Sequence, residues 1–236
     1  MRQKYHLLPT LTIFAILLTS AIAAAGWTDT LKTAGSEYAD QGATAAGLPY
    51  TPSEAVAGIK EVLSLGTNYA TSSLSAPGGF SANPATTFSL PTSLTSLGDT
   101  TNLLSSLNSA AEGAAPGTGN VFLDAIQKLA VGDYSTLLGG GEDAITRFFE
   151  NSSRETLKKM VRPVVDKSVE STGVNAYLAP LMAAQQASNI AGPVFNPVDY
   201  LTDRTLDGMF FYMGMKEKDI RSSNGAGTTD LLQKLF

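Results

Sequence analysis

The residues able to do chemistry in this chain are mainly carboxylates, because two reactive side-chain types are missing from most of it. There is no cysteine, and the single histidine, His6, lies in a leader-like segment of 25 residues. Serine-histidine-aspartate triads, cysteine-histidine dyads and zinc sites built from histidine or cysteine are therefore excluded after that segment. Catalysis would have to rest on carboxylates, Lys, Tyr, Ser or a hard metal ion held by oxygen.

Three aspartates at four-residue spacing, Asp199, Asp203 and Asp207, form a candidate calcium site. On a helix this spacing places the carboxylates on a single face, where their oxygens could share a Ca²⁺ ion with a neighbouring loop. Calcium needs about six to eight converging oxygens, whereas a straight helix presents carboxylates about 6 Å apart along one line. A solvated acidic face is the simpler interpretation, because the helix dipole favours negative charge near the N-terminus.

A carboxylate-based enzyme is a second hypothesis, with Asp124, Asp143 or Asp207 as general acid and base. Such residues are usually helix caps or members of surface ion pairs, and a pKa perturbed by burial cannot be inferred from sequence. Two of these carboxylates in one pocket would favour catalysis, whereas scattered exposed carboxylates would argue against it. We assign no catalytic residue from the sequence and predict no cofactor.

The first 25 residues have the features of a secretory signal peptide. Arg2 and Lys4 precede an apolar run from Leu11 to Ile22, and small residues follow it. This run is shorter than the roughly 20 residues of a membrane span, so we predict cleavage and no membrane span afterwards. Without a cysteine, attachment as a lipoprotein through an N-terminal Cys is excluded. The expected location is periplasmic or secreted.

The charge balance narrows the classes of partner. Removing the leader takes away two of the 16 basic residues and none of the 21 acidic ones, so the formal charge falls from −5 to −7. An acidic surface disfavours nucleic acid and anionic membranes, because both bind basic surfaces. The expected partner is therefore another protein of the periplasm.

The element that must position most of these groups is a long helix from about Asn196 to Arg221. Asn196 can cap its first amides, and Pro197 suits the first helical position because it lacks an N–H. Basic residues gather at the other end, which matches the helix dipole. The stretch from Met209 to Met215 is apolar on nearly every side, which a helix tolerates only when other helices surround it. We predict this as the central core helix.

The remainder of residues 53–236 is predicted as a single domain of shorter helices around that one. The spacing of apolar residues indicates helices at about 52–75, 94–115, 120–129, 144–151, 154–171, 176–190 and 229–236. Breaks are expected at Pro116 and at Ser152, where Ser152 and Glu155 form a capping-box pattern. Pro163 should kink the helix in which it lies.

The fold class is predicted as all-α, because no segment shows sustained alternation of apolar and polar residues. We expect an irregular multi-helix domain rather than a heptad bundle, since Pro and Gly interrupt the chain too often for long parallel helices. Residues 26–52 have few apolar side chains and should be weakly ordered. Residues 78–91 indicate a long ordered loop pinned by Phe80 and Phe88, with a structural or a functional role left open.

An ordered set of motifs extends from Gly58 to the C-terminus. The motifs are GIKEVLSLGT at 58–67, GGFSANP at 78–84, LPTSL at 90–94, VFLDAI at 121–126, GGGEDAITRFF at 139–149, LDGMFF at 206–211, EKDIR at 217–221 and TTDLLQKLF at 228–236. In this order they resemble an uncharacterised bacterial family defined only as an exported domain of unknown function. The resemblance implies an exported, periplasmic, helical protein of Gram-negative-type bacteria and no particular activity. Asp203, unlike Asp199 and Asp207, falls outside the family pattern.

Three functional hypotheses follow. The first hypothesis, which we favour because motifs for other activities are missing, is a binding or assembly protein with a groove or surface for a periplasmic partner. A carrier of an apolar ligand is an alternative, since the cluster Met209–Met215 could line a cavity, although a packed core needs the same residues. The carboxylate-based enzyme is the third. We expect the apolar C-terminal stripe, Leu231 to Phe236, to dock on the core, with docking on a partner as the alternative.

Overall fold

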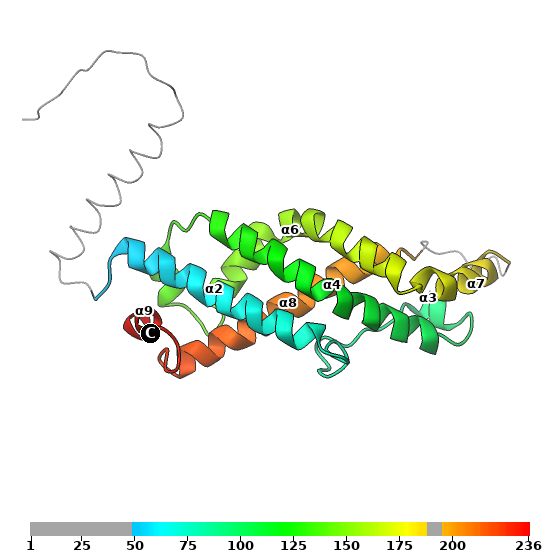
Figure 1. The fold of residues 1–236 in the computed structure, drawn as a ribbon, viewed down its shortest axis with the longest axis horizontal. Helices are drawn as coiled ribbons and strands as arrows, with labels where there is room; N and C mark the ends of the chain where they lie inside the picture. The colour runs from blue at the N-terminus through cyan, green and yellow to red at the C-terminus, as the bar shows by residue number, and fades with distance from the viewer. Residues whose placement is uncertain (1–48, 188–194) are drawn as a thin grey trace, which may run out of the picture.

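The structure is a computed structural model that describes residues 49–187 and 195–236, and the regular elements in these ranges are helices (Figure 1). The long helices are α2 (Pro52–Ser75), α4 (Thr101–Lys128), α6 (Ala144–Ser171) and α8 (Pro197–Ser222). The short ones are α3 (Thr92–Thr95), α5 (Tyr134–Leu138), α7 (Val174–Ala187) and α9 (Asp230–Leu235). The predicted all-α class is therefore confirmed for the described residues. The predicted leader and most of the predicted weakly ordered segment lie outside them.

The four long helices pack into an elongated bundle in which each runs opposite to the next along the chain (Figure 1). α2 and α6 each contact both α4 and α8, so the four helices close a ring around a shared core. α5 lies in the connection from α4 to α6, and α7 lies in the connection from α6 to α8. α8 contacts α2, α4 and α6, which is the central position that its apolar middle predicts.

The core of the bundle is centred on three phenylalanines from three helices. Phe122, Phe149 and Phe210 are buried, and their ring centroids lie 5.2 to 6.0 Å apart in tilted and edge-to-face pairs. These geometries are favourable for aromatic rings. Within the cluster Met209–Met215, four side chains are buried, whereas Phe211 is half-buried and Met215 is exposed. Most of the cluster therefore belongs to the core.

The expectation that Pro and Gly would prevent long helices is wrong. α4 continues through Pro116, where the sequence predicts a break, and the start of the separate helix predicted at about residue 120 lies inside it. Gly117 shows the reason, because a Cβ there would lie 2.6 Å from Val164 of α6. The glycine therefore permits close helix packing, and this tertiary contact outweighs a low local helix propensity.

The helix start predicted at Ser152 is also wrong. α6 runs without interruption from Ala144 to Ser171 and includes Pro163. Instead of capping a new helix, the Ser152 hydroxyl donates a hydrogen bond to the carbonyl of Phe149, one turn earlier. A serine whose hydroxyl bonds to a backbone carbonyl of the preceding turn is compatible with a helix interior.

The connection between α2 and α3 is an ordered loop, as predicted. Phe80 and Phe88 are buried with ring centroids 5.1 Å apart, and the Tyr200 hydroxyl donates to the carbonyl of Ser89 at 2.8 Å. A Cβ on Gly79 would lie 2.5 Å from the carbonyl oxygen of Ser73, so the tight passage after α2 needs glycine. These contacts give the loop a structural role.

The predicted cap of α8 at Asn196 is confirmed, and the last helix is capped as well. The Asn196 side chain accepts hydrogen bonds from the amides of Val198 and Asp199, and Thr229 caps α9 by accepting from Leu232. α9 docks on α2, where a Cβ at Gly58 would overlap the Leu235 side chain. The C-terminal stripe therefore packs on the protein's own core. Across the described ranges, none of the helices combines the length and the apolar character needed to span a membrane.

Replacement of Phe210 by alanine tests the core. Loss of its contacts with Phe122 and Phe149 should lower the free energy of unfolding by about 3–5 kcal/mol, measured by urea denaturation followed by circular dichroism. Phe211→Ala is the matched control, because the neighbouring ring is only half-buried and should cost clearly less. Equal losses for the two variants would contradict the packing described above.

Candidate functional site

The aspartate stripe of α8 faces a matching basic stripe on α6. The ion pairs are Arg162–Asp199 (2.9 Å), Lys158–Asp203 (2.7 Å) and Arg154–Asp207. Both stripes repeat every four residues, and the two helices run in opposite directions, so one antiparallel register aligns all three pairs. The hydrogen bond from Lys158 to Asp203 raises the pKa of that lysine. The side chains are partly exposed, so these pairs contribute little stability and chiefly favour this register.

These ion pairs account for the aspartate stripe without a metal ion. Each carboxylate faces a cation of α6, and no group of three or more side chains suited to a metal ion occurs among the described residues. Calcium would have to displace three cations and gain further oxygen ligands. The calcium site at Asp199, Asp203 and Asp207 stays a prediction that calorimetry can test.

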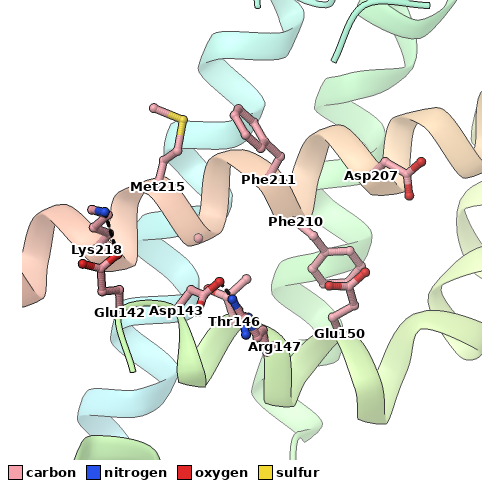
Figure 2. A pocket seen from close by; sticks show the side chains of 11 residues that line it. Glu142, Asp143, Thr146, Arg147, Glu150, Asp207, Phe210, Phe211, Met215 and Lys218 are labelled. Atoms are coloured by element: carbon pink, nitrogen blue, oxygen red, sulfur yellow. Dashed lines mark hydrogen bonds and ion pairs between the residues drawn. The ribbon is translucent and has the colours of Figure 1, made fainter. Parts of the chain in front are cut away.

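A cleft of about 430 Å³ lies between the first half of α6 and the second half of α8 (Figure 2). Its lining residues are Glu142, Asp143, Thr146, Arg147, Glu150, Asp207, Phe210, Phe211, Gly214, Met215 and Lys218. The cleft thus combines apolar side chains of α8 with charged side chains from both walls. Of the three candidate catalytic carboxylates, Asp143 and Asp207 line it together, whereas Asp124 is not part of it.

Each carboxylate of the cleft has a cationic partner. The pairs are Glu142–Lys218 (2.6 Å), Asp143–Arg147 (2.8 Å), Glu150–Arg154 (2.6 Å) and Asp207–Arg154. The hydrogen bond from Lys218 to Glu142 raises the pKa of the lysine. These four acidic side chains are between 32% and 69% exposed. The convergence of Asp143 and Asp207 in one pocket meets the criterion that favours catalysis, whereas both carboxylates are ion-paired and partly exposed, and a general acid or base is usually tuned by desolvation.

Sequence reasoning assigned no role to Glu217, the most buried carboxylate in the part of the chain that the structure describes. It has no exposed surface, and its two oxygens accept hydrogen bonds from the amides of Ile145 (2.9 Å) and Thr146 (2.7 Å). These amides lie in the first turn of α6, where a helix leaves N–H groups without internal partners. The Asp143 side chain, at the N-cap position, makes no capping bond. Glu217 therefore caps α6 from α8, across 72 positions of sequence.

Arg221 completes this buried group. It pairs with Glu217 at 2.8 Å and donates to the carbonyls of Leu137 and Leu138, each at 2.8 Å. Its guanidinium also lies 4.8 Å from the ring centroid of Phe236, the last residue. We call Glu217, Arg221 and the groups that they bind the Glu217 clamp. It joins the end of α5, the start of α6, α8 and the C-terminus.

A sequence signal for Glu217 did exist. It follows Met213 by four residues and precedes Ile220 by three, so it occupies a position on the buried face of α8. Arg221 follows Glu217 by four residues, which is the spacing at which oppositely charged side chains pair on a helix. A carboxylate at a core position with a basic residue one turn away indicates a buried, paired charge.

Neutralising Glu217 tests the clamp. Glu217→Gln should lower the free energy of unfolding by about 3 kcal/mol, because the Arg221 charge and one buried amide lose their acceptor. Asp219→Asn is the matched control, since Asp219 is an exposed member of an ion pair on the same helix, and it should change stability by less than about 0.5 kcal/mol. Urea denaturation compares the variants, and a Glu217→Gln protein as stable as the control would contradict the clamp.

Calorimetry with Ca²⁺ separates the two interpretations of the aspartate stripe. If the ion pairs with α6 explain it, titration should release no binding heat, and EDTA should leave the melting temperature unchanged. A binding heat that disappears in Asp203→Asn would establish the calcium site instead. Asp166→Asn, on the neighbouring helix but outside the stripe, is the control.

Comparison with known proteins gives a family but no activity. The family model described as "Protein of unknown function (DUF4197)" matches residues 49–236, a range that includes every helix from α2 to α9. Searches of curated proteins and of solved structures gave no match. The match spans more than half of the chain, so this protein belongs to the DUF4197 family of proteins of unknown function.

Proposed function

We propose that this protein is an exported binding or assembly protein that holds a segment of a partner protein in the cleft between α6 and α8. The observation that carries the proposal is a cleft in which Met215 is 42% exposed and Phe211 is half-buried, inside a charged rim. Methionine and aromatic residues are enriched at protein interfaces, and a polar rim surrounds such apolar centres. The cleft has this composition.

The openness of the cleft favours a macromolecular partner. Its volume is within the range of small-ligand sites, but such sites bury most of their ligand. Here three rim side chains, Glu142, Arg147 and Lys218, are between 60% and 71% exposed, so the rim does not close over a small molecule. An open cleft of this kind suits a segment that belongs to a larger partner.

The alternative hypothesis, that the protein carries an apolar ligand, has weaker support. Four members of the cluster Met209–Met215 are buried and pack in the core, and of these four only Phe210 also lines the cleft, beside Phe211 and Met215. Close-packed interiors leave no room for a ligand. The apolar part of the cleft is therefore small, and charged groups surround it.

Export is part of the proposal and is supported by the sequence. Arg2 and Lys4, followed by the apolar run and the small residues, have the pattern of a secretory leader. A chain without cysteine suits an oxidising compartment, since it needs no disulfide. We propose a periplasmic location for the mature protein.

Site-specific photo-crosslinking in intact host cells tests the proposed cleft. A photoreactive phenylalanine analogue at Met215 should give one reproducible adduct with a partner protein, because this side chain lies at the centre of the proposed interface. Met160 is the matched control, since it is a methionine of similar exposure (38%) on α6 outside the cleft. Mass spectrometry identifies the adducts. The same adducts at both positions, or none at Met215, would contradict the proposal.

A further inference from the structure

An apolar patch continues from the edge of the cleft across α8 onto α2. It consists of Tyr69, Phe211, Tyr212 and Met215, and we call it the α2–α8 patch. We infer that this patch binds residues 27–38 of the same chain, which thereby cover the apolar edge of the cleft. The inference goes beyond the proposed function, because a partner segment that uses Phe211 and Met215 would have to displace residues 27–38 first.

The four side chains of the patch are contiguous. The ring centroids of Tyr69 and Tyr212 lie 6.0 Å apart across the two helices, and those of Phe211 and Tyr212 lie 5.2 Å apart. Met215 follows Phe211 by one helical turn, and Figure 2 shows both side chains on one side of α8. Tyr69 is 40% and Met215 is 42% exposed. Contiguous exposed apolar surface of this kind marks a site of interaction.

The charges beside the patch are already paired, so they do not select its occupant. In the adjoining cleft, Asp207 pairs with both Arg154 and Arg204, and the other carboxylates also have cationic partners. From Val62 to Ser75, α2 carries no charged side chain. The surface that lacks a partner is therefore uncharged and apolar, and it suits an apolar stripe of side chains.

The hydroxyl group of Tyr212 is a second, independent sign of an occupant. Tyr212 is only 8% exposed, and its hydroxyl has no hydrogen-bond partner among the residues that the structure describes. The hydroxyl of a tyrosine buried to this degree usually has a partner. A backbone carbonyl of a segment that packs on the patch would accept this hydrogen bond.

Residues 27–38 have apolar side chains at a spacing that fits the patch. Trp27, Leu31 and Tyr38 fall on one face of a helix, over a length of about 16 Å. The segment has too few apolar residues to bury a core of its own, and such segments become ordered only when they bind another surface. The α2–α8 patch offers that surface within the same chain.

The chain is also long enough to bring this segment back to the patch. Tyr50 packs against the core directly before α2 begins at Pro52, so it fixes the point from which the segment extends. Tyr69 lies about 28 Å from Tyr50 along a helix. The twelve residues from Tyr38 to Tyr50 reach up to about 40 Å when extended. The segment can therefore run back along α2 to the patch.

The intrinsic fluorescence of Trp27 tests the inference, because Trp27 is the single tryptophan of the chain. In the purified full-length protein, docking should shift its emission to shorter wavelength and protect it from quenching by acrylamide. Tyr69→Asp places a charge in the patch, so it should return both properties to those of a solvent-exposed tryptophan. Tyr177→Asp is the matched control, since Tyr177 has a similar exposure (46%) but lies on α7. Circular dichroism verifies that both variants fold.

A second pair of variants alters the α8 side of the patch. Met215→Asp should also expose Trp27, whereas Met160→Asp, at a methionine of similar exposure (38%) on α6, should not. Exposure of Trp27 in both patch variants and in neither control would support the inference. A solvent-exposed Trp27 in the unchanged protein, or equal emission of each patch variant and its control, would overturn it.

Dilution of the unchanged protein distinguishes docking within the chain from docking on a second copy. Emission of Trp27 that is independent of protein concentration would support docking within the chain. Emission that moves to longer wavelength on dilution would show that residues 27–38 pack on another copy, and it would overturn the inference. These measurements use the purified protein alone, so their outcome does not depend on whether a partner of the cleft exists.

Discussion

The Glu217 clamp is the interaction on which the arrangement of α6 and α8 depends. A carboxylate without exposed surface is costly unless it is paired and hydrogen-bonded. Glu217 meets this condition through the amides of Ile145 and Thr146 and through Arg221. These partners are available only if α6 begins where it does and lies directly against the second half of α8. The clamp therefore fixes the position of α6 relative to α8 more strictly than apolar packing alone, which tolerates volume-conserving exchanges.

The candidate site is built from the same two stretches of chain that the clamp joins. Asp143 and Thr146 line the cleft on either side of Ile145, and Lys218 of the cleft follows Glu217 directly. The ion-pair stripes of α6 and α8 continue from this point towards the other end of the bundle. Arg221 extends the connection to Phe236, so the C-terminus also depends on the clamp. A partner in the cleft would thus contact residues whose positions are set by buried groups.

The sequence predicted what local signals determine and missed what tertiary contacts determine. The start of α8 was predictable because Asn196 and Pro197 act within one turn, and Thr229 signals α9 in the same way. The continuity of α4 was not predictable from the sequence, because Pro116 has the local features of a helix end. Only the packing of α4 against α6 shows that the helix continues. The aspartate stripe was visible in the sequence, but its basic partners were not identifiable without the antiparallel register of α6 and α8. Glu217 lay at a core position that could have been noticed, whereas its amide partners are set by the fold.

Amide hydrogen exchange of Ile145 and Thr146 tests the central claim most directly. First-turn amides of a helix have no acceptor within the helix and normally exchange readily. Because Glu217 accepts hydrogen bonds from both amides in the core, the clamp predicts that they exchange only through opening with a free energy close to that of global unfolding. Exchange of Ile145 and Thr146 as fast as that of exposed first-turn amides elsewhere in the bundle would contradict the account.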